Sequence, residues 1–185
     1  EGFFVSFSYD IALSVIEKCH ENGNVIALNI SAVYIIEHFA REFLHCWKKS
    51  DILIGNMSEF DALCKTLRLS AKPFLERLKR VQTMMLTEKE PNAKSCKLSS
   101  KDQWKKILIV TNAKEPVFCV YGDNVVIEIN VPLVRDSEIV DTSGAGDSFF
   151  GAFLYGLLEN NSIERCLELG CTVSSRVIRR HGYDL

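Results

Sequence analysis

The sequence predicts an α/β protein in which helices flank a mainly parallel sheet. The first observation is that short apolar runs alternate with longer amphipathic stretches, the pattern of strands connected by crossover helices. The second is a composition of 47% hydrophobic and 25% charged residues, which fits a globular protein and argues against disorder. The third is the lack of any internal repeat, low-complexity tract or domain boundary, so we expect residues 1–185 to belong to one domain.

The strands and helices are expected to follow one another through most of the chain. In order they are helix 8–22, strand 25–28, helix 32–49, strand 52–54, a helix that begins at Asn56, helix 73–86, strands 107–111, 117–121 and 125–131, and helices 144–158 and 162–180. Residues 88–106 are polar and are expected to form a surface loop. The sequence Gly122-Asp123-Asn124 is a hairpin turn signal between the last two strands.

Residues with strong capping and stopping preferences set these boundaries. The expected caps and stops are Ser8, Gly23, Ser31, Gly55, Asn56 with Glu59, Pro73, and Asn161 with Glu164. In the two Asn–Glu pairs the acidic residue stands three positions after the cap, which is the capping-box spacing.

Charge, cysteine usage and hydropathy exclude several classes of function. The formal net charge is -2 and the basic residues are scattered, so no basic field would attract nucleic acid or anionic lipid. The seven cysteines form no C-x-x-C pair and stand mostly in apolar segments, which indicates a reducing, cytoplasmic setting. The longest apolar run, residues 149–158, is too short to span a bilayer. No methionine precedes Met57, and we expect an internal or C-terminal piece of a longer protein.

The stretch Asp141-Thr142-Ser143-Gly144-Ala145-Gly146-Asp147 stands directly before a very apolar helix. Because that helix is apolar on every side, we expect it to be buried, with unpaired backbone N–H groups at its start. Gly144, Ala145 and Gly146 carry little or no side chain, so an anion could reach those N–H groups closely. Asp147, favoured there by the helix dipole, would lie beside that anion. A base beside an anion hole is what phosphoryl transfer to a hydroxyl requires.

Other glycine motifs fit this stretch less well. A P-loop would need Lys and then Ser or Thr where Ala152 and Phe153 stand, which excludes it. A dinucleotide fingerprint would need a third glycine at Phe149 and a place early in a βαβ unit. A plain helix start with packing glycines and a capping aspartate stays open as an alternative.

Residues 141–147 match every fixed position of D-T-x-G-A-G-D, and the chain resembles the ribokinase-like family of sugar and nucleoside kinases. Within that family it is similar to the adenosine kinases. The supporting matches are Gly2-Phe3-Phe4 with their G-F-F, Asn29-Ile30-Ser31-Ala32 with N-L-S-A, residues 51–59 with D-I-L-F-G-N-x-x-E, and Val177-Ile178-Arg179-Arg180 with I-I-R-R. The resemblance implies a three-layer α/β sandwich. This chain would be its C-terminal, ATP- and phosphate-binding half, without the family's N-terminal strands and lid.

The resemblance also implies an activity and residue roles. The activity is transfer of the γ-phosphoryl group of ATP to the 5′-hydroxyl of adenosine, giving AMP, with Mg²⁺ as cofactor. Asp147 is the expected general base, and Gly144, Ala145 and Gly146 form the expected anion hole. The other implied site residues are Asn56 and Glu59 for phosphate and Mg²⁺ (Glu59 through water), Thr111 and Ser143 for ATP, Phe3 and Tyr34 for the adenine ring, and Asp141 and Thr142 as braces of the loop.

The chain departs from the family pattern at several points. Ala113 stands where T-x-G usually has its glycine, so it would crowd the nucleotide or disfavour a positive φ. Cys171 stands where histidine is common, and the part of the family that grips the ribose hydroxyls is missing. Two alternatives therefore stay open: a non-catalytic nucleotide-binding pseudo-kinase fragment, and a kinase for another nucleoside or a sugar. The expected setting is a monomer in the cytoplasm, with the nucleus as a second compartment and no nucleic-acid or membrane partner.

Overall fold

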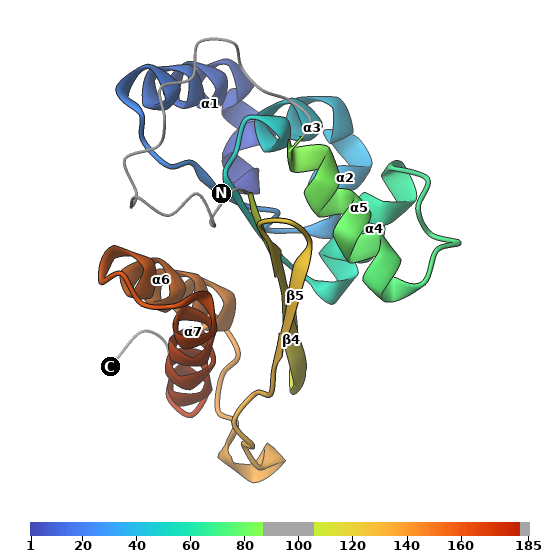
Figure 1. Cartoon of the computed structure of the whole chain (residues 1–185). Helices are drawn as coiled ribbons and strands as arrows, with labels where there is room; N and C mark the ends of the chain where they lie inside the picture. Colours follow the sequence, from blue (N-terminus) through green and yellow to red (C-terminus); the bar gives the residue numbers. More distant parts are fainter. Residues whose placement is uncertain (87–105, 182–185) are drawn as a thin grey trace. The chain divides into compact units, whose positions relative to one another are not determined.

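The computed structural model describes residues 1–86 and 106–181, whose helices and strands are shown in Figure 1. In chain order the elements are α1 (Gly2–Asn22), β1 (Ala27–Asn29), α2 (Val33–His38), α3 (Ala40–Lys48), β2 (Ile52–Asn56), α4 (Met57–Thr66), α5 (Phe74–Leu86), β3 (Ile107–Asn112), β4 (Glu115–Tyr121), β5 (Val125–Ile129), the 3-10 helix η2 (Asp136–Glu138), α6 (Ala145–Leu158) and α7 (Ile163–Val177). The surface loop expected over residues 88–106 lies, except for Lys106, outside the described residues.

The five strands form one sheet in the order β1-β2-β3-β4-β5. β1 and β2 are parallel, with Leu28 opposite Leu53, and α2 and α3 connect them. β3 begins beside the start of β2, because the Ile107 N–H donates to the Asp51 carbonyl at 2.8 Å, and α4 and α5 connect these strands. β4 and β5 follow through connections of two and three residues, which are too short for a crossover and make hairpins. The predicted α/β fold with its parallel strand pairing is confirmed.

Residue contacts divide the chain into two compact units. Unit 1 comprises Glu1–Val110 and Cys119–Val126, and therefore holds helices α1 to α5. Unit 2 comprises Thr111–Phe118 and the residues from Ile127 onward, and holds η2, α6 and α7. The expectation that residues 1–185 belong to one domain stays a prediction.

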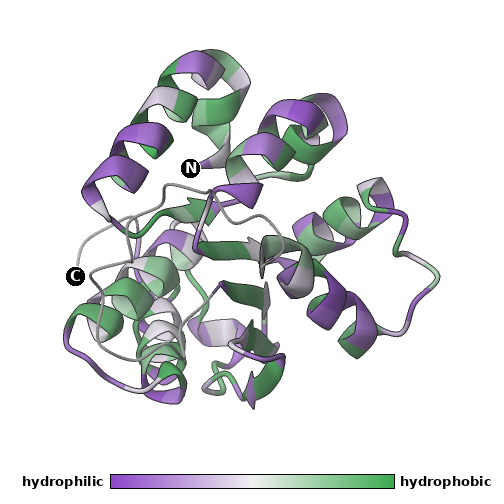
Figure 2. Ribbon diagram, turned by 45° about the horizontal axis from the view of Figure 1, so that its top comes forward, coloured by the Kyte–Doolittle hydropathy of each residue, from purple (hydrophilic) through white to green (hydrophobic). Residues whose placement is uncertain are grey.

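Large apolar side chains from helices and strands build the core of unit 1. Figure 2 shows strands that are largely hydrophobic and helices on which hydrophobic and hydrophilic residues alternate, as expected when each helix buries one face. The largest fully buried side chains of the unit are Trp47, Phe43, Phe60, Ile30, Ile35, Ile36, Leu53, Leu63, Leu78, Met85 and Ile107. Burying one such side chain contributes roughly 1.5–3 kcal/mol, so this set holds the helices against the strands.

The start of the chain differs from the sequence expectation. α1 begins at Gly2, six residues before the predicted start, and Ser8 interrupts it with φ -148° and ψ 49°. Ser31 does not cap a helix, because its φ is 71° and its hydroxyl accepts from the Gly2 N–H at 2.9 Å. The same hydroxyl donates to Glu1 Oε2 at 2.8 Å. A contact between segments 29 residues apart thus replaces the local cap, and no local pattern could predict it. The predicted stop at Gly23 is confirmed.

Two boundaries of predicted elements in the middle of unit 1 also differ from the structure. The helix expected over residues 32–49 is divided into α2 and α3, because Phe39 leaves helical geometry with φ -125° and ψ 31°. The strand expected to stop at Gly55 continues through it to Asn56. The helix predicted after Pro73 is confirmed as α5.

The cap of α7 is one residue later than predicted. The N-cap is Ser162, whose hydroxyl accepts from the Arg165 N–H at 3.3 Å. The Asn161 side chain instead donates to the Gly156 carbonyl at 3.2 Å and so holds the end of α6. The expected Asn161–Glu164 capping box is therefore wrong, because Asn161 makes a contact with the preceding helix.

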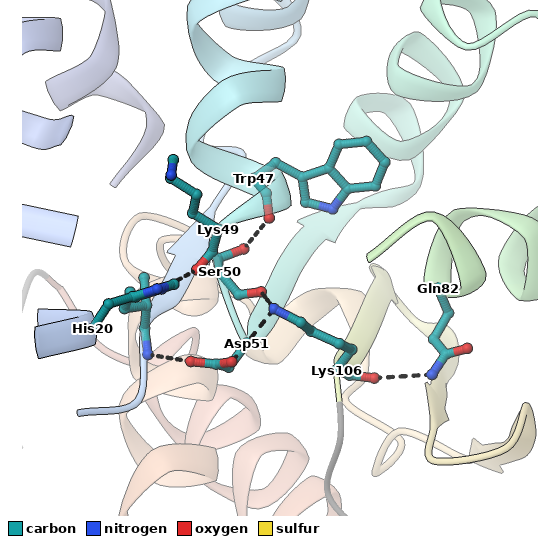
Figure 3. Close-up of polar contacts among 8 residues, drawn as sticks. His20, Trp47, Lys49, Ser50, Asp51, Gln82 and Lys106 are labelled. Atoms are coloured by element: carbon teal, nitrogen blue, oxygen red, sulfur yellow. Dashed lines mark hydrogen bonds and ion pairs between the residues drawn. The ribbon is translucent and has the colours of Figure 1, made fainter. Parts of the chain in front are cut away.

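A cluster of polar contacts joins the amino ends of β1, β2 and β3 (Figure 3). Asp51 Oδ2 accepts from the Ile26 N–H at 2.9 Å, and Asp51 Oδ1 lies 3.4 Å from Lys106 Nζ. Lys106 Nζ also donates to the Ser50 carbonyl at 2.6 Å, and Gln82 donates to the Lys106 carbonyl at 3.2 Å. One carboxylate therefore satisfies groups from the segments that lead into three strands. We infer that these contacts stabilise the sheet at the amino ends of its strands.

We expect Asp51→Ala to lower the free energy of unfolding by about 1–3 kcal/mol, because the Ile26 N–H loses its acceptor and the Lys106 ammonium loses its ion-pair partner and keeps only the Ser50 carbonyl. Urea unfolding followed by circular dichroism measures the change. Lys18→Ala is the matched control, since it breaks an exposed ion pair of 2.7 Å with Glu21 and should cost less than about 1 kcal/mol. Equal losses in the two variants would contradict a structural role for Asp51.

Candidate functional site

The first group of site residues lies at the carboxyl end of β2, where α4 begins. Asn56 Oδ1 accepts from the Glu59 N–H at 3.0 Å, and Glu59 Oε2 accepts from the Asn56 N–H at 2.9 Å. A third hydrogen bond joins Asn56 Nδ2 to Glu59 Oε1 at 2.8 Å. The predicted capping box is confirmed, and both carboxylate oxygens are held in place. In α/β proteins, ligands bind outside the carboxyl ends of the parallel strands, so this is a position for function.

Glu59 is a buried carboxyl group, with only 6% of the residue exposed. Burial raises the pKa of Glu59 above its usual value, the backbone hydrogen bond from Asn56 opposes this rise, and the nearby charge of Glu1 adds to it. Gly55 makes the position possible, because a Cβ there would lie 3.0 Å from Glu59 Oε2 and nearer still to the Ile30 side chain. A buried carboxyl group with a perturbed pKa at a ligand-binding edge is a candidate functional residue.

A second polar group, which the sequence reasoning did not assign to the site, lies at the carboxyl end of β1. Asn29 Oδ1 accepts from the Ser31 N–H at 3.0 Å, and the Ser31 hydroxyl donates to Glu1 Oε2. Glu1 is close enough to Glu59 to raise its pKa, so the polar groups after β1 and β2 are neighbours. The available signal was the pair of polar residues Asn29 and Ser31 at the end of a buried apolar strand, since parallel strands place such residues at one edge.

The two aromatic residues predicted to contact adenine lie side by side. The ring centroids of Phe3 and Tyr34 are 6.1 Å apart, with the ring planes tilted by 36°. They come from α1 and α2, and the residues are 41% and 43% exposed. Two exposed rings in contact leave faces open to a flat partner, which an aromatic residue of the core would not do.

The glycine stretch forms a tight turn before α6 in unit 2. Gly144 has φ 74° and ψ 3°, in the left-handed region that glycine adopts without strain. Asp141 Oδ1 accepts from the Ser143 N–H at 2.9 Å, and the Ala145 N–H donates to the Thr142 carbonyl at 3.2 Å. Asp141 and Thr142 therefore hold the turn together, as the resemblance implied.

The start of α6 is open to a ligand. Among the described residues, the backbone N–H groups of Gly146 and Asp147 have no acceptor, as is usual in the first turn of a helix. A Cβ added at Gly146 would meet nothing within 4 Å, so free space lies in front of these groups. The Asp147 side chain stands in the same turn and is exposed. Two free donors beside one carboxylate can bind an anion and accept a proton.

The expectation that α6 is buried on every side is wrong for this chain. Phe149, Phe153 and Leu157 are buried, while Tyr155 is 59% exposed and Leu158 69% exposed. α6 packs closely on α7 (Figure 1), and the residues on its other side stay exposed. The apolar composition of α6 predicted burial on all sides, and the described residues of unit 2 do not cover all of its apolar side chains.

The residue at the usual glycine position after β3 takes up an unfavourable backbone conformation. Ala113 has φ 49°, the left-handed region that the sequence analysis expected this position to need. A residue with a Cβ pays about 1–2 kcal/mol there. Thr111 is half-buried at the end of β3, two positions before Ala113.

The predicted site residues fall into both units. Phe3, Tyr34, Asn56 and Glu59 belong to unit 1, whereas Thr111, Ser143, Gly144, Ala145, Gly146 and Asp147 belong to unit 2. Within unit 1 the structure brings Asn56 to Glu59 and Phe3 to Tyr34. Within unit 2 it brings Asp147 to the glycine turn.

Among the candidate site residues, Glu59 is the one that could serve as a ligand of Mg²⁺. No group of three or more His, Cys, Asp or Glu side chains that could hold a metal occurs in residues 1–86 and 106–181. Mg²⁺ in phosphoryl-transfer sites is usually held by one or two carboxylates together with waters and substrate phosphates. Glu59 fits as one such ligand, directly or through water, because its carboxylate lies at the strand end.

The chain belongs to the pfkB family of carbohydrate kinases, whose pattern matches residues 1–185. It is similar to adenosine kinase 1 of Arabidopsis thaliana, with 31% identity over 183 residues, and to the adenosine kinase of Saccharomyces cerevisiae, with 27% identity over 182 residues. These matches cover 98% of this chain and 48% of each relative. The chain thus spans about half the length of the curated relatives it matches.

Solved structures show the same fold. The adenosine kinase of Anopheles gambiae, in complex with P1,P4-di(adenosine-5) tetraphosphate, matches with a TM-score of 0.83 and 30% identity over 98% of this chain and 50% of that one. The adenosine kinase of Schistosoma mansoni, in complex with 2-fluoroadenosine, matches with a TM-score of 0.84 at 22% identity, over all of this chain and 50% of that one. The predicted ribokinase-like fold is confirmed, and the relatives are nucleoside and sugar kinases.

The raised pKa of Glu59 determines the direction in which the free energy of unfolding changes with pH. Between the unfolded pKa and the raised native pKa, the native chain keeps a proton that the unfolded chain has lost, so stability falls as pH rises. We expect the free energy of unfolding of the wild type, relative to Glu59→Gln, to fall as pH rises from the usual pKa of glutamate through the raised native pKa of Glu59. Urea unfolding at several pH values measures it.

Glu76 is the matched control with the opposite sign. Hydrogen bonds from Arg80 and then Lys72 lower the pKa of Glu76, so its contribution is present above the unfolded pKa and is lost as pH falls. The wild type should therefore gain stability relative to Glu76→Gln as pH rises toward the usual pKa of glutamate, which is below the pH range in which the Glu59 contribution falls. The same direction of change for both pairs would contradict the assignment for Glu59.

We expect Ala113→Gly to raise the free energy of unfolding by up to about 1 kcal/mol, because glycine adopts φ 49° without a Cβ penalty. Ala152→Gly is the control, since Ala152 lies inside α6, where glycine costs about 1 kcal/mol. Thermal or urea unfolding of both variants should give changes of opposite sign. A loss in both would show that the left-handed backbone at Ala113 carries no strain.

Proposed function

We propose that this chain is the ATP- and phosphate-binding half of an adenosine kinase, transferring the γ-phosphoryl group of ATP to the 5′-hydroxyl of adenosine. The observation that carries the proposal is the open start of α6, where two free backbone N–H groups lie beside the Asp147 carboxylate. The similarity to adenosine kinases over nearly the whole chain supports it.

In this proposal Gly144, Ala145 and Gly146 line the anion hole, and the Ala145 N–H keeps its hydrogen bond to the Thr142 carbonyl. The N–H groups of Gly146 and Asp147 donate to the transferring phosphoryl group, and the positive end of the helix dipole favours its charge. One donor of this kind typically contributes about 10²- to 10³-fold in rate. Ser143 and Thr111 contact the nucleotide.

Asp147 is the proposed general base. It would take the proton from the 5′-hydroxyl as the oxygen attacks the γ-phosphorus and the bond to ADP breaks. Its exposed place in the first turn of α6 leaves the carboxylate free to meet the hydroxyl. The product of this transfer is AMP, and ADP leaves.

Asn56 and Glu59 are the proposed phosphate- and Mg²⁺-organising residues, with Glu59 acting through water. When bound, Mg²⁺ would neutralise phosphate charge. Asn56 holds both Glu59 oxygens, so the carboxylate is oriented before any ligand arrives. Phe3 and Tyr34 would stack on the adenine, which two adjacent exposed rings favour over a sugar alone.

The setting we propose is a cytoplasmic monomer that binds adenosine and ATP. None of the six cysteines of the described residues forms a disulfide. Burial raises the pKa of Cys64, Cys166 and Cys171 to about 11, so these thiols behave as core residues. In the part of the chain that the structure describes, no helix has the length and hydropathy needed to cross a membrane.

Two observations favour a second candidate, a nucleotide-binding pseudo-kinase. Ala113 occupies a left-handed position next to the proposed ATP contact Thr111, where its Cβ would narrow the nucleotide site. The chain also spans about half of its relatives, so part of the nucleoside pocket has no counterpart in residues 1–185. This candidate predicts ATP binding without transfer.

We expect residues 1–185 alone to form little or no AMP from adenosine and ATP in the presence of Mg²⁺, and Asp147→Asn to lower the remaining rate by about 10²- to 10⁴-fold while ATP binding is retained. A coupled AMP assay and calorimetric titration with ATP measure the two quantities. Asp136→Asn in the exposed helix η2 is the control and should keep the wild-type rate.

The outcomes separate the candidates. A rate that is unchanged by Asp147→Asn contradicts the proposed base. ATP binding without AMP from either protein favours the pseudo-kinase. Absence of ATP binding contradicts both.

A further inference from the structure

The segment that leads into the glycine turn is attached to the C-terminal end of α7. The N–H groups of Val140 and Asp141 both donate to the Ile178 carbonyl, at 2.8 Å and 3.3 Å. Ile178 is the residue directly after α7, which ends at Val177. Asp141 Oδ1 then accepts from the Ser143 N–H at 2.9 Å. A short series of hydrogen bonds therefore connects the end of α7 to the turn before α6.

Side chains on both sides of this attachment meet at one carboxylate. Glu138 Oε2 accepts from Arg135 Nε at 2.9 Å, and Glu138 Oε1 lies 3.8 Å from Arg179 Nε. Hydrogen bonds from Arg135 and the nearby charge of Arg179 keep the pKa of Glu138 below its usual value, so the carboxylate stays ionised at neutral pH. An exposed ion pair alone contributes little to stability, but this one adds to two backbone hydrogen bonds between the same segments.

The start of α6 is fixed to the same helix, and α6 and α7 lie along each other in Figure 1. Phe149, two positions after Asp147, is buried, and its ring lies against Gly170 of α7. A Cβ at Gly170 would lie 2.8 Å from two ring carbon atoms, so the ring and its helix would have to shift. The lack of a side chain at Gly170 therefore sets how near the start of α6 lies to α7.

A second glycine contact joins the same two helices at the other end of α6. A Cβ at Gly156, in the last turn of α6, would lie 2.9 Å from Cys166 Sγ. The helical rise places Gly156 roughly 15 Å along α6 from Gly146. The chain therefore has two close glycine contacts of the same kind, of which only that of Gly170 lies beside the candidate site.

We propose that α7 positions the anion hole, with Gly170 and Glu138 as the positioning residues. Gly170 sets the place of the first turn of α6, which carries the free N–H groups and Asp147. Glu138 holds the segment before the glycine turn on the end of α7 through Arg179. Neither residue touches a ligand, because each acts through the backbone of the turn. The inference rests on the proposed function in one respect, namely that the start of α6 binds phosphate.

The first test places a methyl group between the two helices. We expect Gly170→Ala to weaken the binding of inorganic tripolyphosphate at least about tenfold, because the displaced Phe149 moves the N–H groups of the first turn. Calorimetric titration measures the affinity. Hydrogen exchange at Ser148, whose N–H donates to the Gly144 carbonyl at 2.9 Å, should become faster. The double variant Gly170→Ala with Phe149→Leu removes atoms from the contact and should recover most of the affinity.

Gly156→Ala is the matched control, because it introduces the same methyl group into the other close contact of α6 and α7. It should leave tripolyphosphate binding and exchange at Ser148 unchanged. Urea unfolding gives the stability of both variants, so their affinities are compared at known stability. A purely structural role of Gly170 predicts the same behaviour for the two variants.

The second test changes Glu138, which is exposed, and leaves the core untouched. Glu138→Gln should speed hydrogen exchange at Val140 and Ser143 and weaken tripolyphosphate binding about two- to fivefold, because the segment loses its charged contact with the end of α7. Glu168→Gln is the control, since it removes an exposed ion pair of 3.1 Å with Arg165 within α7 and should change neither quantity.

Hydrogen exchange and phosphate binding separate this inference from the proposed function. If the wild-type chain does not bind tripolyphosphate, the proposed anion hole is contradicted, and the exchange rates at Ser143 and Ser148 still decide whether α7 positions the turn. Equal effects of Gly170→Ala and Gly156→Ala on both readouts would overturn the inference for Gly170. Exchange at Ser143 that Glu138→Gln leaves at the wild-type rate would overturn it for Glu138.

Discussion

The reciprocal hydrogen bonding of Asn56 and Glu59 is the constraint on which the first unit's candidate site depends. It ends β2, starts α4 and fixes a buried carboxylate in a single arrangement. The arrangement costs free energy, because burial opposes ionisation of Glu59, and the hydrogen bonds from Asn56 recover part of that cost. The contacts of Asp51 lie at the opposite ends of the strands and connect the segments that lead into them, so they are separate from the candidate site.

Short sequence patterns correctly predicted those helix ends that depend on contacts between residues close together in the chain. The spacing of Asn56 and Glu59 indicated their capping box, and Gly23 indicated the end of α1, because caps involve atoms a few residues apart. Ser31 and Asn161 failed as predicted caps for the opposite reason. Each uses its side chain on a partner that the fold supplies, namely the start of α1 and the end of α6.

The candidate site was predictable to the same extent. The sequence indicated the glycine turn and the free donors before α6, since φ preferences and helix ends are local properties. It did not indicate that Glu1 acts on Glu59, or that Tyr155 and Leu158 stay exposed, because both depend on which segments fold against each other. The apolar composition of a helix indicates how much of its surface needs to be covered, but it does not indicate which segment covers that surface.

The lack of space for a side chain at Gly55 affects how this site tolerates substitutions. A side chain there would press on both Glu59 and Ile30, so position 55 has no conservative replacement while Glu59 keeps its place. Substituting Glu59 by a smaller residue relieves one of those two clashes. The effects of changes at positions 55 and 59 are therefore non-additive. In a mutational survey of this chain, the effect of a side chain at position 55 would therefore depend on the residues at both position 59 and position 30.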